Sequence, residues 1–254
     1  MEMKIFVSWA LGLAFALMPA VASATSADTA RADALKQAIR ARCWVAPRGL
    51  FADNPDGDLF SQHMNALAVL YDVVPRDQGA AILARIVAPG KGIDAPEGIT
   101  PVSYYFVWYL AQAYVHAGRA DNYIDLLQTW RDLLKLNYTT WPEERDTDKR
   151  STRSDSHAWS VHPTADLLGI VAGIGPGAPA YGRVRVEPAL GGLKQIDATA
   201  ATPAGPVTVR HPIAGGRLSA RITRPAALLG EFVWRGQSYP LPRPTTVLTL
   251  DARP

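Results

Sequence analysis

The sequence has very little cysteine and few charged residues. Cys43 is its single cysteine, so no disulfide can form within the chain and its stability must come from packing. We expect Cys43 to be a half-buried structural residue. Charged residues make up 19% and apolar residues 48%, a balance that excludes wholesale disorder. After residue 24 no apolar run is long enough to span a membrane.

The N-terminus does contain a long apolar run. Lys4 precedes apolar residues from Ile5 to Val21, and small residues stand at Ala22 and Ala24. This order is typical of a secretory signal peptide, here residues 1–24, cleaved after Ala24. An uncleaved membrane anchor is the alternative. The sequence thus predicts an exported protein, periplasmic or extracellular, with no membrane segment once the signal is removed.

Charge is unevenly distributed along the chain. Residues 25–180 carry 15 basic and 18 acidic side chains, whereas residues 181–254 carry 10 basic and 4 acidic. The arginines of the second part are spread among strand-like residues, which indicates outward strand positions and not a nucleic-acid patch. We therefore expect no nucleic-acid partner, and attraction to an acidic polysaccharide stays open.

The first part of the chain has helical periodicity. Residues 61–74 predict a helix with Ser61 as its N-cap, and residues 77–87 a second one. Residues 101–117 are apolar nearly all round and end at Gly118, whereas residues 119–137 are amphipathic. The two segments together predict a hairpin of an inner and an outer helix.

From Tyr181 onward the pattern changes to short alternating segments separated by glycine or proline. They indicate antiparallel strands of a small β-sandwich. The sequence therefore predicts a helical domain at residues 25–178 and a β-sandwich at residues 179–254.

The segment between the helices and the strands, "NYTTWPEERDTDKRSTRSDSHAWSVHP" at residues 137–163, concentrates carboxylates, tryptophans and histidines. Ser154, Asp155, Ser156 and His157 have the residue types of a serine triad, but consecutive side chains cannot form its hydrogen-bond chain. His157, His162 and Asp155 lack a recognised metal-ligand spacing. The turn-rich "DNPDGD" run departs from the EF-hand pattern. The sequence predicts no metal and no cofactor.

A loop that combines carboxylates with aromatic rings suits carbohydrate chemistry. Glycoside cleavage needs two carboxyl groups, one as acid and one as base or nucleophile. Glu143 directly follows "TTWP", and His157 and Trp159 can return to the same place. The alternative is that Glu143 and Glu144 are solvated and the tryptophans lie in the core.

The run from Arg153 to Val209, "RSDSHAWSVHPTADLLGIVAGIGPGAPAYGRVRVEPALGGLKQIDATAATPAGPVTV", resembles the C-terminal part of bacterial α-L-rhamnosidases of the six-hairpin glycosidase type. Upstream segments at residues 49–70 and 100–114 resemble late helices of the same barrel. The resemblance implies a mainly α protein, with a partial (α/α)6 toroid of late helical hairpins followed by a small antiparallel β-sandwich. It also implies release of terminal L-rhamnose with inversion, from a rhamnose-containing glycoside.

The resemblance also assigns roles to residues. The family's general base is a glutamate that ends a "TTxxE" pattern, which corresponds to Glu143, with Glu144 as the alternative. His157 corresponds to the histidine of the "HAW" motif that contacts the sugar, and Trp159 and Trp141 are expected to wall the pocket.

One departure matters: the segment that supplies the family's general acid has no counterpart in this sequence. Asp53, Asp56 and Asp58 lie in a turn-rich context and are not expected to replace it. Activity of the chain alone thus stays open, and the partners expected are a second copy or a separately encoded front half. The alternative function is a non-catalytic sugar-binding or assembly remnant.

The roles of two further groups of residues stay open. Gln62, His63 and Asn65 begin a helix and either face the same mouth or serve the helix start. Core packing is favoured for Tyr104, Tyr105 and Trp108 over a sugar pocket.

Overall fold

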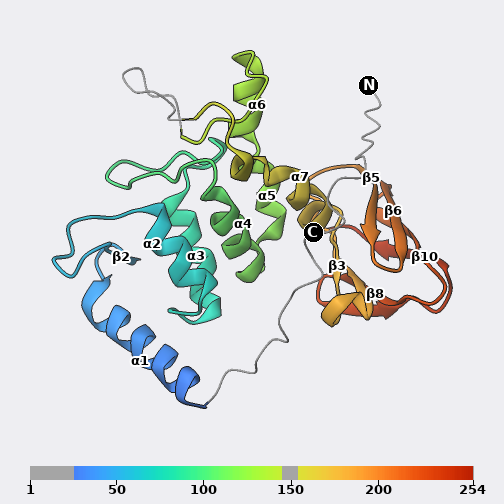
Figure 1. Ribbon diagram of the computed structural model, residues 1–254, viewed down its shortest axis with the longest axis horizontal. Coiled ribbons are helices and arrows are strands. Elements are labelled where there is room, and N and C mark those ends of the chain that lie inside the picture. The colour runs from blue at the N-terminus through green and yellow to red at the C-terminus, as the bar shows by residue number, and fades with distance from the viewer. Residues whose placement is uncertain (1–25, 145–153, 254) are drawn as a thin grey trace.

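The computed structural model describes residues 26–144 and 154–253. The predicted signal peptide lies outside the described residues. Helices occupy the first part of the chain and strands the second, and Figure 1 shows them as two neighbouring bodies joined through α7. In the part of the chain that the structure describes, no helix is long and apolar enough to cross a membrane.

The prediction of a mainly α protein is wrong. About 36% of the described residues are helical and 25% lie in strands, which form three sheets. Two causes reduce the helix content. Long connections interrupt the helical part at residues 87–106 and, among the described residues, at 136–144 and 154–157, and the alternating segments after residue 174 pair over nearly their full length.

The first half of the helical part is a small group of packed helices. Helix α2 packs against both α3 and α4, and Figure 1 shows the three side by side, with α1 standing apart. Ser61 caps α2 as predicted, since its hydroxyl accepts the Met64 amide at 3.1 Å. The bounds are α1 Ser26–Cys43, α2 Gln62–Leu70, α3 Arg76–Ile86 and α4 Val107–His116.

The helical hairpin is shorter than the sequence predicts, and its outer segment is interrupted. The inner helix α4 begins at Val107 and not near residue 101, although it ends as predicted, with Gly118 at φ +69°. The outer segment divides into several short pieces, because turns interrupt it. The pieces and the helices that follow are η1 Ala120–Asn122, α5 Tyr123–Leu126, α6 Gln128–Lys135, η2 Ala158–Val161, α7 Pro163–Asp166 and the π-helix η3 Leu167–Val171.

The strands form one small hairpin and two four-stranded sheets. The hairpin pairs β1 Trp44–Val45 with β2 Leu50–Phe51. One large sheet has the order β10-β7-β6-β5 and is antiparallel throughout, whereas the other, β3-β4-β8-β9, pairs β4 with β8 in parallel. The sheets are therefore not purely antiparallel. Their strands are β3 Ile174–Pro176, β4 Arg183–Val186, β5 Gln195–Thr202, β6 Gly205–Ala214, β7 Arg217–Thr223, β8 Leu229–Trp234, β9 Gln237–Pro240 and β10 Thr245–Asp251, with the short helix η4 Pro179–Tyr181 before β4.

Tight backbone contacts join the helical part to the strands. Gly173 has φ +69°, and a Cβ there would lie 2.1 Å from the carbonyl carbon of Glu187. Gly191 donates its amide to the Asp121 carboxylate at 3.0 Å, and a Cβ on it would meet Ile124 at 2.6 Å. Both positions require glycine: a side chain at Gly191 would push the chain away from the helical part, and one at Gly173 would disrupt the start of the β3–β4 pair, where the helical part meets the strands.

Candidate active site in the loop after α6

The loop after α6 starts from a defined helix end. Asn137 has φ +62°, a conformation that asparagine tolerates better than most residues, and the Tyr138 amide donates to the Leu133 carbonyl at 3.1 Å. This end turns the chain away from the helix axis. The segment that carries Glu143 therefore leaves α6 in a fixed direction.

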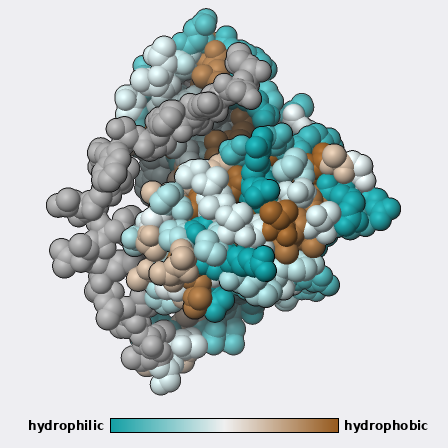
Figure 2. Space-filling model, turned by 90° about the vertical axis from the view of Figure 1, so that its right-hand side faces the viewer, coloured by the Kyte–Doolittle hydropathy of each residue, from teal (hydrophilic) through white to brown (hydrophobic). Residues whose placement is uncertain are grey.

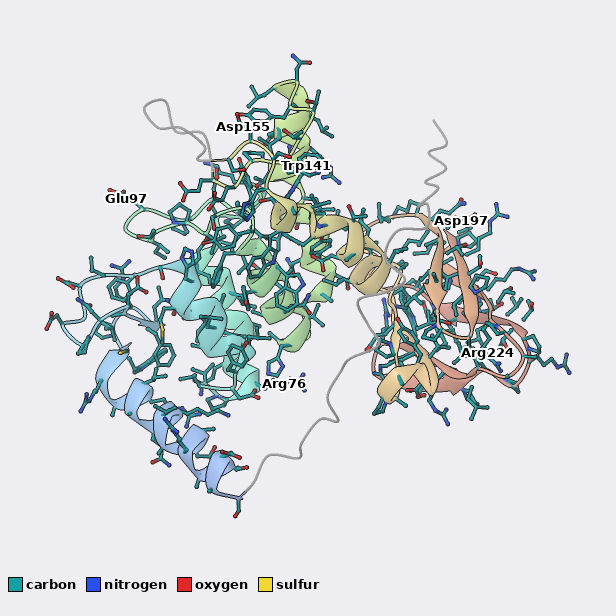
Figure 3. The ribbon with its side chains drawn as sticks, viewed as in Figure 1. Arg76, Glu97, Trp141, Asp155, Asp197 and Arg224 are labelled. Atoms are coloured by element: carbon teal, nitrogen blue, oxygen red, sulfur yellow. The ribbon has the colours of Figure 1, made fainter. Side chains whose placement is uncertain are left out.

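The two described arms of the loop are hydrogen-bonded to each other. The Glu143 amide donates to the Ser154 carbonyl, and the His157 amide donates to the Trp141 carbonyl, each at 2.8 Å. The Thr140 hydroxyl adds a bond to the Asp155 carbonyl. Figure 3 shows Trp141 and Asp155 close together near the base of α6. Residues distant in sequence, 140–143 and 154–157, thus become neighbours.

This pairing brings Glu143 and His157 together. Glu143 Oε2 lies 3.8 Å from His157 Nδ1, and the side chains are 14% and 28% exposed. The distance is too long for a hydrogen bond but short enough for an ion pair with a protonated imidazole. Glu143 is therefore the loop carboxylate that lies beside His157. A mostly buried carboxylate beside an imidazole is a suitable arrangement for proton transfer.

A cluster of aromatic rings begins at His157. The Tyr105 ring centre lies 5.5 Å from that of His157 and 5.6 Å from that of Trp159, and Tyr109 lies 6.2 Å from Trp159. Trp159 is 48% exposed, so its ring presents an apolar surface to solvent beside the ion pair. Tyr105 is the functional candidate that the sequence did not favour. Its only sequence signal is the run of aromatics before α4.

Trp141 is placed differently from Trp159. It is half-buried and packs against the hydrophobic core, and within the described residues its ring makes no aromatic contact with His157 or Trp159. Its backbone carbonyl holds His157 instead. Trp141 therefore supports the loop, and its role as a pocket wall stays a prediction.

A buried polar network lies under the return arm of the loop. His162 Nδ1 is 2.7 Å from Asp166 Oδ2, and its Nε2 is 3.3 Å from the Tyr104 carbonyl. The Trp130 indole donates to the Ser160 carbonyl at 3.0 Å. Burial, helped by the nearby Asp166, strongly raises the pKa of the Tyr123 hydroxyl. This network fixes residues 158–166, so Trp159 stands on a rigid base.

The two ring nitrogens of His162 are thus occupied by Asp166 and the Tyr104 carbonyl, and not by His157. In the described ranges 26–144 and 154–253, no three His, Cys, Asp or Glu side chains gather as a metal would require. The metal alternative from His157, His162 and Asp155 therefore finds no support in the geometry.

The polar residues at the start of α2 mostly serve the fold. The buried Gln62 side chain donates to the Ile86 and Ile93 carbonyls and accepts the Val102 amide, at 2.7 to 3.1 Å. Asn65 exchanges two bonds with the Phe51 backbone, each at 2.9 Å. His63 stacks on Phe106 at 4.3 Å, and burial lowers the pKa of its imidazole despite the nearby Asp53.

Depressions on the surface lie near the loop but not at Glu143. One of about 360 Å³ is bordered by Lys91, Asp94 and Glu97, and another of about 200 Å³ by Lys91, Tyr104 and Tyr138. Glu143, His157 and Trp159 line neither. The geometry of the candidate site therefore rests on the Glu143–His157 pair and the neighbouring rings, and not on these two depressions.

Comparison with known proteins identifies relatives. Residues 173–231 match the family described as bacterial α-L-rhamnosidase C-terminal domain. No curated protein matches the chain. These residues include Gly173, strands β3 to β7 and the start of β8.

Solved structures extend the likeness over most of the chain. A GH78 family rhamnosidase of Bacillus sp. GL1 is 25% identical with a TM-score of 0.66, and the match covers 82% of this chain and 24% of that protein. The α-L-rhamnosidase from Aspergillus terreus is 17% identical with a TM-score of 0.67, covering 89% of this chain and 27% of the other.

A Streptomyces avermitilis α-L-rhamnosidase, solved with L-rhamnose, is 17% identical with a TM-score of 0.62, covering 89% of this chain and 23% of the other. The chain thus spans about a quarter of the length of these proteins. The resemblance inferred from the "HAW" region and the segment after it is confirmed. The chain is therefore similar to the C-terminal part of α-L-rhamnosidases, a GH78 family rhamnosidase among them.

Proposed function

We propose that the chain contributes a terminal L-rhamnose site to an α-L-rhamnosidase, with Glu143 as its general base. The observation that carries the proposal is the Glu143–His157 pair, 3.8 Å apart, beside the exposed ring of Trp159. The pyranose ring would lie on Trp159 and Tyr105 through its C–H groups, and His157 would bind a sugar hydroxyl. Trp141 would border the site.

In this proposal Glu143 accepts a proton from a water molecule. That water attacks the anomeric carbon on the face opposite the leaving oxygen, so the configuration inverts. A second carboxyl group must donate a proton to the leaving oxygen, and in inverting enzymes the two carboxyl groups stand about 6.5–9.5 Å apart. We propose that a second copy of the chain or a separately encoded chain supplies this acid. Alone, the chain would be weakly active.

The remaining parts of the proposal concern location. Rhamnose-containing glycosides are proposed as the natural substrates, met outside the cytoplasm after export through residues 1–24. We propose no nucleic-acid partner.

Hydrolysis of a chromogenic α-L-rhamnoside tests the proposal. We expect slow turnover by residues 25–254, reduced at least about 100-fold in Glu143→Gln. Glu144→Gln is the matched control, because it removes the adjacent loop carboxylate, and it should keep most of the activity. Equal losses in both variants would contradict the assignment of the base.

The second candidate is sugar binding without turnover. The exposed ring of Trp159 favours it, because a ring on the surface binds a sugar whether or not an acid is present. Folded protein that binds L-rhamnose and does not hydrolyse the glycoside would select this candidate.

A further inference from the structure

The outer face of the sheet β10-β7-β6-β5 carries polar side chains in regular rows. Side chains along its strands alternate, so Val207 and Val209 are buried while Thr208 and Arg210 point outward. The same holds for Ile222, buried between outward neighbours. Outward residues on adjacent strands therefore form rows across the sheet.

One row consists of threonines on all four strands. Thr199 is opposite Thr208, Thr208 is opposite Thr223, and Thr223 is opposite Thr245. Their hydroxyls bond in pairs, at 2.9 Å between Thr199 and Thr208 and 3.2 Å between Thr223 and Thr245. Neighbouring strands lie about 4.8 Å apart, so the row offers a regular line of hydroxyl groups that donate and accept.

The next row contains two arginines directly opposite each other. Arg210 pairs in register with Arg221, an arrangement of like charges that destabilises a sheet. Asp197 lies 3.5 Å from Arg210, whose side chain is 61% exposed, but within the described residues no carboxylate lies within ion-pair distance of Arg221. A carboxylate held between the two guanidinium groups would relieve their repulsion.

The charge of the whole strand part favours an acidic partner. Residues 181–254 carry 10 basic and 4 acidic side chains. Glu187 and Glu231 pair with Arg185, and Asp251 pairs with Arg253. Figure 2, which views the molecule from the side of the strands, shows a largely hydrophilic surface with only scattered hydrophobic patches. Apart from the buried Arg224, the excess of positive charge therefore lies on exposed or half-exposed side chains.

We propose that this face binds an acidic polysaccharide, a chain of uronic acid sugars. Arg210 and Arg221 would hold carboxylates through their planar donor groups, and the threonine row would bond to sugar hydroxyls. Neither row contains an aromatic ring, which disfavours stacking of nucleic acid bases. The choice of a polysaccharide among polyanions rests on the proposed function, whereas the surface itself does not involve Glu143.

Binding of the full chain to polygalacturonate at low salt tests the proposal. The double variant Arg210→Ser/Arg221→Ser should bind roughly tenfold more weakly. The matched control Arg183→Ser/Arg243→Ser removes the same charge from exposed positions outside the two rows and should change the affinity less than about twofold. Equal weakening in both double variants, or none in the first, would overturn the proposal. Thermal unfolding of each variant establishes that it is folded.

The threonine row has its own variant. Thr199→Val/Thr208→Val keeps the shape and removes two hydroxyls, so we expect a loss of about threefold that added salt does not alter. Dextran should not bind, and duplex DNA and polyglutamate should bind more weakly than polygalacturonate. Equal binding of any of these three would overturn the assignment to an acidic polysaccharide.

The same proteins separate this proposal from the proposed function. Glu143→Gln should bind polygalacturonate like the parent chain, and Arg210→Ser/Arg221→Ser should keep the activity on the chromogenic rhamnoside. Loss of one property therefore leaves the other measurable.

Discussion

The loops of the helical part and the turns of the strand part are stabilised in different ways. In the strand part, two-residue turns join paired strands. Gly215 and Gly216, at φ +56° and +73°, connect β6 to β7, and Arg235 and Gly236 connect β8 to β9. In the helical part, long loops are held by buried side chains such as Gln62 and His162.

The difference explains where each candidate surface lies. Backbone ladders place the rows of the outer sheet face, so its ligands would meet a rigid, repetitive surface. The Glu143 loop depends instead on a few specific side chains beneath it, as functional loops on a scaffold usually do. A disturbance of one buried polar side chain should therefore affect the loop site far more than the sheet face.

The largest effect is expected at the junction of the two parts. Gly173→Ala should lower the free energy of unfolding by about 4 kcal/mol, because its Cβ would overlap the Glu187 carbonyl at a positive φ. Gly118→Ala is the matched control, since it has the same φ of +69° with open space around it, and should cost about 1 kcal/mol. Urea unfolding measures both. Similar costs at the two positions would contradict a tight junction.

Removal of a loop support in the helical part comes next. Gln62→Ala leaves two carbonyls and one amide without their partner and should lower the free energy of unfolding by about 3 kcal/mol. The control Gln195→Ala removes an exposed glutamine of β5 and should change the free energy of unfolding by less than about 0.5 kcal/mol. If the two variants unfold alike in urea, the buried amide does not hold these loops.

The strand part contains a buried polar group of another kind. His211 is fully buried against Phe232, and both its ring nitrogens lack a hydrogen-bond partner among the described residues. Burial lowers the pKa of His211 to about 4, from an ordinary 6.5. The unfolded chain therefore takes up the proton first, and stability present above pH 6.5 falls as the pH is lowered towards 4.

As the pH is lowered from 6.5 to 4, His211 should reduce the free energy of unfolding by roughly 3 kcal/mol, with no further reduction below pH 4. His211→Leu should remove that component, so the stability difference between parent and variant should change over this range. Urea unfolding at pH 7.5, 5.5 and 4 measures it. A difference that is constant with pH would mean that His211 does not titrate on unfolding.

The sequence predicts the strand part better than the helical part, for a physical reason. Alternation along residues 205–214 and 217–223 determines which side chains face inward, and short turns fix the pairing. The helical pattern of residues 101–117 overestimates α4, because the turn at Tyr104 and Tyr105 depends on distant contacts with His162 and His157. The overall balance of helix and strand differs from the prediction because long connections interrupt the helical part and the later segments pair as strands over nearly their full length.

The candidate site was predicted in part from composition and resemblance. The structure brings Glu143, His157 and the backbone of Trp141 together, through bonds between residues 11 to 16 positions apart that no local pattern encodes. The involvement of Tyr105 could not be predicted, because a run of aromatics fits a core equally well. The assigned roles in sugar binding and catalysis remain predictions.

Titration with L-rhamnose by calorimetry tests the central claim, that the loop after α6 forms a sugar site, most directly. The parent chain should bind the sugar, Trp159→Ala should weaken binding at least about tenfold, and Trp44→Ala, which removes another exposed tryptophan, should leave it unchanged. Equal affinity of all three proteins, or no binding by the folded parent chain, would contradict the account.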